Sequence, residues 1–170
     1  VRYGNVVGSR GSVIPFFKKL IENGSSFLPI THPSMTRFWI TIKEGVDLVN
    51  KVFYEMHGGE IFIPIIPSVK IVDLAKAMAP KLKLKIIGIR PGEKIHEIMF
   101  SKDDTPNVLK FKKYYVIAPN TIFYKTLSTY KINKSKERGT KIKNDFEYNS
   151  GSNSKFLSIK EIRKYNLEEV

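Results

Sequence analysis

The chain of 170 residues contains no cysteine, has no long hydrophobic run and does not begin with methionine. The lack of cysteine excludes disulfide bonds, thiolate metal sites and thiol catalysis, and it fits a reducing cytoplasm. No apolar stretch approaches the roughly 20 residues that a transmembrane helix needs, and the first residues lack the regions of a secretory signal. We therefore expect a cytoplasmic protein without a membrane partner. The missing methionine suggests a fragment or a processed chain.

Positive charge is in excess, with a formal net charge of +13, and 23 of the 29 basic residues are lysine. A basic balance can indicate binding to nucleic acid or to an acidic membrane surface. Here the lysines are scattered along the chain, and the nearest approach to a cluster is the polar segment Lys131–Lys143. We find neither zinc-finger spacing nor an aromatic RNA-binding signature. The charge therefore favours a solvated surface, and nucleic-acid binding would rest on net charge alone.

Hydrophobic periodicity predicts strands that alternate with helices, which is typical of an α/β domain. The expected strands are Val1–Val7, Glu60–Ile65, Lys83–Ile89 and Tyr114–Ala118. The expected helices run from Ser12 to Gly24, from Thr41 to Gly58, over Ile71–Ala79, over Glu93–Phe100 and from Ser158 onward. The stretch between Pro119 and Ser154 is polar and weakly periodic, which predicts mostly loop.

Two capping boxes mark helix starts, Thr41 with Glu44 and Ser158 with Glu161. In the helix that follows Thr41, apolar residues recur at helical spacing and should share one face. These residues are Val46, Val49, Val52, Phe53 and Met56.

Three motifs occur in order: RYGNVVGSRGS at Arg2–Ser12, MTRFW at Met35–Trp39 and IRPGEKIHE at Ile89–Glu97. With Met56–Phe62, Asp73–Pro80 and Asp145–Tyr148, they resemble the inverting UDP-N-acetylglucosamine 4,6-dehydratases of pseudaminic-acid synthesis. Those enzymes belong to the polysaccharide-biosynthesis branch of the extended short-chain dehydrogenase/reductases. The resemblance extends over nearly all of residues 1–150.

The resemblance implies an NADP-binding Rossmann domain followed by a smaller domain that holds a UDP-sugar. Residues 1–150 would then be the last Rossmann strand plus the UDP-sugar-binding domain, and residues 151–170 a helical tail. The family's Asp-Lys pair, Tyr-x-x-x-Lys and glycine-rich phosphate loop would lie in an N-terminal half that this chain lacks. A Tyr-x-x-x-Lys does occur at Tyr130–Lys134, but a chain this rich in tyrosine and lysine contains about one such spacing by chance. We therefore assign no catalytic residue and no metal site.

By the same resemblance, individual residues receive binding roles. The sugar nucleotide would contact Asn5, Val13, Thr31, Arg37, Arg90 and Glu93, with Asn5 at the sugar, Arg90 at the diphosphate and Glu93 on the nucleoside side. The nicotinamide end of NADP would lie along Val6, Val7, Gly8, Ser9 and Arg10.

Structural interpretations compete with these roles. Residues 5–10 can be a buried strand and a packing turn, although the end of a strand in an open α/β sheet is also where ligands bind. Arg37 can pair with an acidic neighbour such as Glu44, or bind phosphate through its guanidinium. Glu93 can favour a helix dipole while Arg90 pairs with it. We expect Met35, Phe38 and Trp39 to be core residues rather than a platform for uracil, and His96 to be structural or exposed.

These observations favour the substrate-binding half of an NADP-dependent UDP-N-acetylglucosamine 4,6-dehydratase that inverts C5 and forms a homo-oligomer when complete. Two alternatives remain. The chain could belong to a retaining dehydratase or an epimerase, which would have the same fold, or it could be an inactive relic or a non-catalytic UDP-sugar-binding module. We expect the reading frame to extend upstream by a Rossmann unit that contains Gly-x-x-Gly-x-x-Gly and Tyr-x-x-x-Lys. Without that half, an exposed sheet edge should make the chain marginally soluble.

Overall fold

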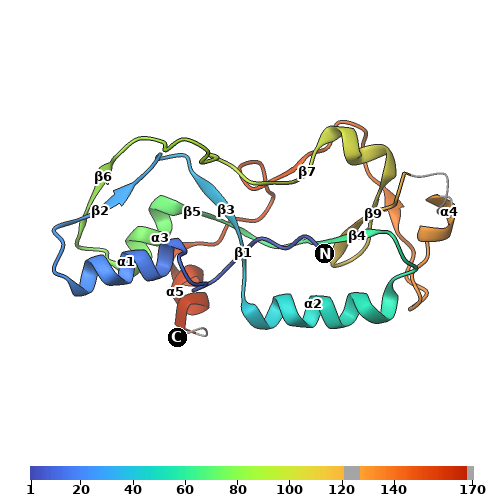
Figure 1. Cartoon of the computed structure of the whole chain (residues 1–170), viewed down its shortest axis with the longest axis horizontal. Helices are drawn as coiled ribbons and strands as arrows, with labels where there is room; N and C mark the ends of the chain where they lie inside the picture. The colour runs from blue at the N-terminus through green and yellow to red at the C-terminus, as the bar shows by residue number, and fades with distance from the viewer. Residues whose placement is uncertain (121–126, 168–170) are drawn as a thin grey trace. The chain divides into compact units, whose positions relative to one another are not determined.

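The computed structural model describes residues 1–120 and 127–167 and divides into two compact units (Figure 1). The chain passes between the units repeatedly, so each unit is built from three separate segments. Unit 1 contains Val1–Tyr3, Lys43–Ile65 and Ile98–Tyr148. Unit 2 contains Gly4–Ile42, Ile66–Glu97 and Asn149–Val170.

Unit 2 combines short parallel and antiparallel strands with helices. Its elements are β1 (Asn5–Val6), α1 (Val13–Glu22), β2 (Phe27–Ile30), β3 (Thr36–Ile40), β5 (Ser68–Lys70), α3 (Ile71–Met78), β6 (Lys83–Ile86) and α5 (Ile159–Leu167). β3 lies between β1, to which it is parallel, and β5, to which it is antiparallel. β2 and β6 form a separate parallel pair. The α/β fold class expected from the sequence is confirmed.

Helix α1 begins and ends close to where the sequence predicts. Its residues Ile14 and Phe17 are buried, and Pro15 falls in the first turn, where its missing N–H has no intrahelical partner to lose. Ser12 occupies the N-cap position, although its hydroxyl makes no capping hydrogen bond. Gly24 follows the C-cap with φ of +71°, a backbone conformation that favours glycine.

The core of unit 2 lies between its helices and strands. In Figure 1, α1, α3 and α5 gather on one side of the β2–β6 pair. Fully buried members of the core include Leu28 and Ile30 from β2, Leu74 from α3 and Ile162 from α5. Each such side chain contributes about 1.5–3 kcal/mol through removal of apolar surface from water. The C-terminal helix is therefore part of the unit 2 core.

The predicted capping box at the start of α5 is confirmed. The backbone N–H of Ser158 donates to Oε2 of Glu161 at 2.8 Å, and the N–H of Glu161 donates to Oγ of Ser158 at 3.3 Å. The bond from the Ser158 backbone, followed by that from its hydroxyl, lowers the pKa of Glu161. Since the ionised carboxylate is the favoured form, the cap stabilises α5 above the ordinary glutamate pKa and loses that effect as the pH falls through the lowered value.

Unit 1 is built around an antiparallel sheet in the order β10-β8-β9-β4. Its elements are α2 (Ile42–Glu55, whose first residue belongs to unit 2), β4 (Ile61–Pro64), β7 (Ile98–Phe100), the 3-10 helix η1 (Lys102–Asn107), β8 (Val108–Lys110), β9 (Tyr114–Ile117), α4 (Leu127–Tyr130) and β10 (Thr140–Lys141). A further strand, β11 (Tyr148–Asn149, whose second residue belongs to unit 2), pairs with β7. Buried side chains from α2 and from the sheet form the core of this unit, among them Val52, Phe62, Leu109 and Val116.

A buried carboxylate ties the loop after α4 to helix α2. Glu55 is 5% exposed and accepts hydrogen bonds from the hydroxyls of Tyr114 and Ser135 and from the side-chain amide of Asn133. Lys51 lies 3.8 Å from the same carboxylate. Burial, and then the bond to Glu55, raise the pKa of Tyr114, which keeps its hydroxyl protonated as a donor. The polar groups of this cluster therefore satisfy one another inside the unit.

The prediction of a helix over Glu93–Phe100 is wrong. The segment before Ile98 forms turns, and Ile98–Phe100 is strand β7. The reason is a tertiary contact: the carbonyl of Ile95 accepts a hydrogen bond from the N–H of Thr36 at 2.9 Å, so it pairs with a distant segment instead of closing a helical turn. The preceding strand is also shorter than predicted and ends at Ile86.

Other sequence predictions agree with the structure to different degrees. The strands expected at Glu60–Ile65 and Tyr114–Ala118 and the helix expected at Ile71–Ala79 are confirmed as β4, β9 and α3. The strand expected over Val1–Val7 is limited to Asn5–Val6. β2, β3 and β5 were not predicted, because each forms by pairing with a segment that is distant in sequence.

Among the residues that the structure describes, no helix is both long and apolar enough to cross a membrane.

Removing the Tyr114 hydroxyl should destabilise unit 1. In Tyr114→Phe, the buried Glu55 carboxylate loses a hydrogen-bond donor, and we expect the free energy of unfolding to fall by about 1–3 kcal/mol. Tyr54→Phe is the matched control, because Tyr54 is 76% exposed and should tolerate the same change. Urea unfolding of both variants measures the difference. Equal midpoints for Tyr114→Phe and the unmodified chain would show that the carboxylate does not depend on this bond.

Candidate functional site

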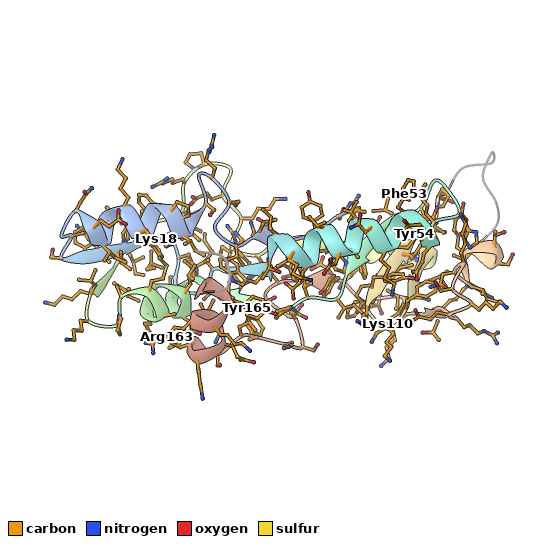
Figure 2. All side chains as sticks on the ribbon, turned by 90° about the horizontal axis from the view of Figure 1, so that it is seen from below. Lys18, Phe53, Tyr54, Lys110, Arg163 and Tyr165 are labelled. Atoms are coloured by element: carbon orange, nitrogen blue, oxygen red, sulfur yellow. The ribbon has the colours of Figure 1, made fainter. Side chains whose placement is uncertain are left out.

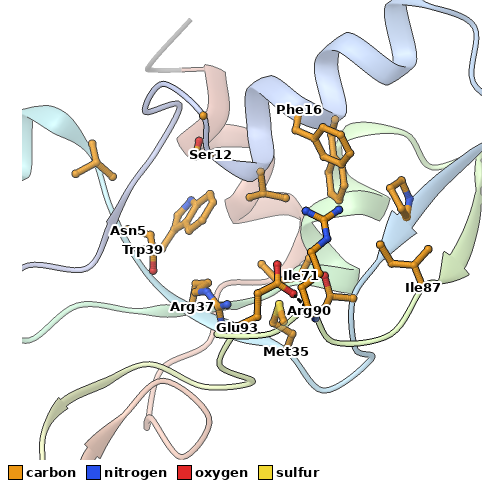
Figure 3. A pocket seen from close by; sticks show the side chains of 16 residues that line it. Asn5, Ser12, Phe16, Met35, Arg37, Trp39, Ile71, Ile87, Arg90 and Glu93 are labelled. Carbon is orange, nitrogen blue, oxygen red and sulfur yellow. Dashed lines mark hydrogen bonds between the residues drawn. The ribbon is translucent and has the colours of Figure 1, made fainter.

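A cavity of about 350 Å³ opens in unit 2 (Figure 3). Its walls come from β1, the N-terminal turns of α1, β2 and the residue that follows it, the segment around β3, the start of α3 and the loop that follows β6. Its volume falls within the range of small-molecule sites, and it combines apolar walls with a few convergent polar groups. The aromatic ring of Phe16 and the side chains of Met35 and Ile87 supply apolar surface, while Arg37 and Arg90 supply positive charge.

The loop after β6 is held against β3 by main-chain and side-chain hydrogen bonds. The N–H of Thr36 donates to the carbonyl of Ile95 at 2.9 Å. The Nη1 group of Arg37 donates to the carbonyls of Thr36 at 2.7 Å and Ile95 at 3.2 Å. These bonds fix the loop, and with it the position of Arg90 and Glu93, relative to the strand.

A second set of contacts connects this loop to the segment after β11. Oγ1 of Thr36 lies 2.8 Å from Nδ1 of His96 and 2.7 Å from Oγ of Ser150, and the N–H of Glu97 donates to Oγ of Ser150 at 2.9 Å. The ring of His96 packs against Gly151 so closely that a Cβ there would lie 2.5 Å from Nδ1. His96 therefore has a structural position, which agrees with one of the two roles expected for it.

Arg37 is both an ion-pair residue and a pocket residue. Its acidic neighbour is Glu97, whose Oε1 lies 3.5 Å from Nε, and not the Glu44 that the sequence suggested. Burial lowers the pKa of Arg37, and the nearby Glu97 and Glu93 carboxylates oppose that shift. The guanidinium remains charged and faces the cavity with part of its hydrogen-bonding capacity already used.

Arg90 and Glu93 bracket a tight turn. Pro91 precedes Gly92, whose φ of +82° suits the third position of a type II turn. The N–H of Glu93 donates to the carbonyl of Arg90 at 3.0 Å, and the N–H of Arg90 donates to Oε2 of Glu93 at 3.2 Å. Within the described residues the guanidinium of Arg90 forms no salt bridge, so the pairing with Glu93 considered from the sequence is not observed. Its charge is available to a ligand.

The structure brings together all six residues predicted to contact the sugar nucleotide. Asn5, Val13, Thr31, Arg37, Arg90 and Glu93 all line the cavity. Their placement at one cavity is an observation, and their binding of a ligand stays a prediction.

The residues predicted to contact NADP are placed differently. Val6 lines the cavity, and the side chain of Val7 is buried in the unit 2 core. Gly8, Ser9 and Arg10 form an exposed turn, with φ of +69° at Gly8 and no atom within 4 Å of a Cβ built there.

Two polar pocket residues, Ser12 and Trp39, received no binding role from the sequence. Oγ of Ser12 and Nε1 of Trp39 are buried and have no hydrogen-bond partner within the described part of the chain, and both residues line the cavity. Trp39 belongs to the core, as expected, and so does Met35, but both also face the cavity. What places Trp39 at the cavity is its pairing with Asn5 in the parallel register of β1 and β3. That pairing could not be read from the sequence alone.

The Tyr130–Lys134 spacing has no feature of a catalytic pair. Tyr130 is 2% exposed, and its hydroxyl donates to the carbonyl of Gly58 at 2.9 Å in unit 1. Within the described residues there is also no group of three or more potential metal ligands.

Comparison with known proteins places these features in a family. The model of the polysaccharide biosynthesis protein family matches residues 1–119. The chain is 56% identical over 161 residues to a UDP-N-acetylglucosamine 4,6-dehydratase (inverting) of Campylobacter jejuni, covering 95% of this chain and 48% of that protein. It is 36% identical over 167 residues to a UDP-glucose 4-epimerase of Rickettsia akari, covering 96% of this chain and 47% of that protein.

The structure is similar to the X-ray structure of Pen from Bacillus thuringiensis, with a TM-score of 0.78 and 29% identity. That match covers 98% of this chain and 48% of the other. The resemblance predicted from the motifs is therefore confirmed, and the chain spans about half the length of the curated relatives it matches.

Gly151→Ala should destabilise unit 2, because the added methyl would displace the His96 ring and break its contact with Thr36. Overpacking of this kind costs about 1–3 kcal/mol. Gly45→Ala is the matched control: no atom lies within 4 Å of its Cβ position, and removing a helical glycine should stabilise by up to about 1 kcal/mol. Denaturant unfolding compares the two, and a Gly151→Ala protein as stable as the unmodified chain would contradict the expectation.

Proposed function

Because the chain belongs to the polysaccharide biosynthesis protein family, we propose that it is the nucleotide-sugar-binding half of an NADP-dependent UDP-N-acetylglucosamine 4,6-dehydratase that inverts C5. The identity of 56% to the Campylobacter jejuni dehydratase over 95% of this chain supports this assignment. In such a reaction, water is lost across C5–C6 of the sugar after transient oxidation at C4.

The observation that carries the proposal is the unpaired guanidinium of Arg90 at the rim of the cavity. A UDP-sugar carries two negatively charged phosphates, and a guanidinium can bind them through two directed hydrogen bonds. Since Arg90 has no salt bridge among the described residues, it can bind a phosphate without first breaking an internal ion pair. Arg37 adds positive charge from a fixed position, because its Nη1 is held by two carbonyls.

The rest of the cavity suits the uncharged parts of the ligand. Asn5, which can both donate and accept, would contact the sugar, and Glu93 would accept hydrogen bonds from nucleoside hydroxyls with the carboxylate oxygen that does not bind Arg90. The buried donors of Ser12 and Trp39 lie at the same cavity and could complete these contacts after a small side-chain adjustment.

NADP would accept and return the hydride, and residues of the half that this chain does not contain would hold most of it. This chain offers the exposed turn Gly8–Arg10, where the open space beside Gly8 permits close approach of a ligand to the backbone. Val7 could contribute only main-chain atoms, since its side chain is buried. These residues fit a supporting role at one end of the cofactor, and the sugar nucleotide would be oriented toward it by Asn5 and Arg90.

A second candidate is a nucleotide-sugar epimerase, favoured by the similarity to the Rickettsia akari protein over 96% of the chain. The two reactions would use the same type of binding pocket and differ in acid and base groups outside this chain. Mass analysis of the product from the longer enzyme separates them, because only the dehydratase product lacks the elements of water.

The isolated chain should bind UDP but should not turn over UDP-N-acetylglucosamine when NADP is supplied. Hydride transfer requires a held cofactor and a positioned acid and base, and we assign none of these groups to this chain. Assays for a 4-keto sugar should be blank, with the Campylobacter jejuni protein as the positive control. Formation of a 4-keto sugar by the isolated chain would contradict the proposal that the catalytic groups lie outside this chain. A chain that neither binds UDP nor turns over would instead indicate a relic.

Arg90→Lys should weaken UDP binding about tenfold, which is roughly 1–2 kcal/mol, because lysine keeps the charge but loses the paired hydrogen bonds. Arg90→Ala should weaken it by roughly 2–4 kcal/mol. Lys94→Ala, which removes an exposed charge from the same loop, is the matched control. Calorimetry measures these affinities, and the fluorescence of Trp39, the only tryptophan of the chain, gives a second readout from within the cavity.

If Arg90 has only a structural role, its substitution should lower the melting temperature of the protein and leave the UDP affinity of the folded fraction unchanged. Equal UDP affinities in the unmodified chain, Arg90→Lys and Arg90→Ala would reject the proposed role.

A further inference from the structure

Helix α2 exposes a continuous stripe of large apolar side chains. The stripe runs from the first residue of α2 to the residue that follows its end, at the spacing of one helical face. Its members are between 41% and 69% exposed: Ile42, Val46, Val49, Phe53 and Met56. The stripe extends about 20 Å along the helix at 1.5 Å per residue. Figure 2 labels Phe53 and the neighbouring Tyr54 near the C-terminal end of α2, where both side chains reach away from the ribbon.

The stripe is not the face by which α2 packs in unit 1. A different side of the helix, including Gly45, Val52 and Glu55, is buried. The five apolar residues predicted to share one face are therefore divided: Val52 lies in the core, while Val46, Val49, Phe53 and Met56 face solvent. Single exposed apolar residues are common on protein surfaces, but a contiguous stripe marks an interaction surface.

The charges beside the stripe disfavour a membrane surface as the partner. Amphipathic helices that lie on membranes carry a polar face rich in lysine and arginine. On α2, Lys43 is paired with Asp47 at 2.7 Å, and Glu44 lies in the same turn. This balance suits an apolar contact with another protein surface.

The lengths of the relatives indicate which protein surface this is. The family model includes all of α2, and the matched proteins of known sequence and structure are about twice as long as this chain. We propose that the α2 stripe docks, through apolar contacts, onto the half of the longer enzyme that this chain does not contain. The inference rests on the proposed function in that it treats the chain as one half of such an enzyme.

The absence of cysteine permits a direct test by thiol labelling. Val49→Cys places a unique thiol in the stripe, and Asp47→Cys places one on the same helix outside it, where the Asp47 side chain is 61% exposed. Each variant is prepared as the isolated chain and as a chimera in which the unmatched half of the Campylobacter jejuni protein, with its cysteines changed to serine, precedes this chain. The rate of reaction with a maleimide is then measured, and a thermal melt follows the folding of each protein.

We expect Val49→Cys to react at least tenfold more slowly in the chimera than in the isolated chain, and Asp47→Cys to react at similar rates in both. Adding Phe53→Asp to the Val49→Cys chimera should restore fast labelling. Equal rates for Val49→Cys in the two proteins would overturn the proposal, as would a chimera that shows no cooperative melt. Protection of Val49→Cys in the isolated chain that grows with protein concentration would overturn it in favour of a second copy. Labelling does not depend on UDP binding, so this inference and the proposed function can fail separately.

Discussion

The cavity of unit 2 depends on how the loop after β6 is held against β3. Thr36 is the centre of that attachment: its N–H binds the carbonyl of Ile95, and its hydroxyl lies within hydrogen-bond distance of His96 and Ser150. These contacts join three segments that are far apart in sequence, and they lie in a mostly buried setting where an unpaired polar group is costly. The loop segment next to the turn of Arg90 and Glu93 is therefore held in place by hydrogen bonds.

The two arginines of the cavity differ in their contacts with this loop. Arg37 is held between β3 and the loop, where its Nη1 donates to two carbonyls and its Nε lies close to Glu97. Arg90 lies outside these contacts, is exposed and makes no salt bridge within the described part of the chain. A fixed charge can provide an electrostatic field, whereas an unpaired guanidinium can adapt its two-hydrogen-bond edge to a phosphate. The proposed binding of a diphosphate uses both properties.

Helix α2 shows how one sequence pattern can serve two surfaces. Its buried side ends in Glu55, whose carboxylate accepts hydrogen bonds from Tyr114, Asn133 and Ser135. These bonds connect the loop after α4 to the helix. Its other apolar side remains in solvent. A helix that is apolar over such a wide arc is typical of a position between two layers, and unit 1 supplies only one of them.

The sequence by itself determined the positions of several helices and the set of candidate site residues. Helical spacing located α1, α2 and α3, and the serine–glutamate pair located the start of α5. The six residues to which the resemblance gave sugar-nucleotide roles line one cavity. Only the tertiary structure decided the conformation of Ile89–Glu97, the strands β2, β3 and β5, the pairing of Trp39 with Asn5 and the division of the α2 apolar residues between core and solvent. The physical reason is the range of the interactions. Caps and helical periodicity act within a few residues, whereas the backbone of Ile95 binds Thr36, 59 positions earlier, and only folding brings the two together.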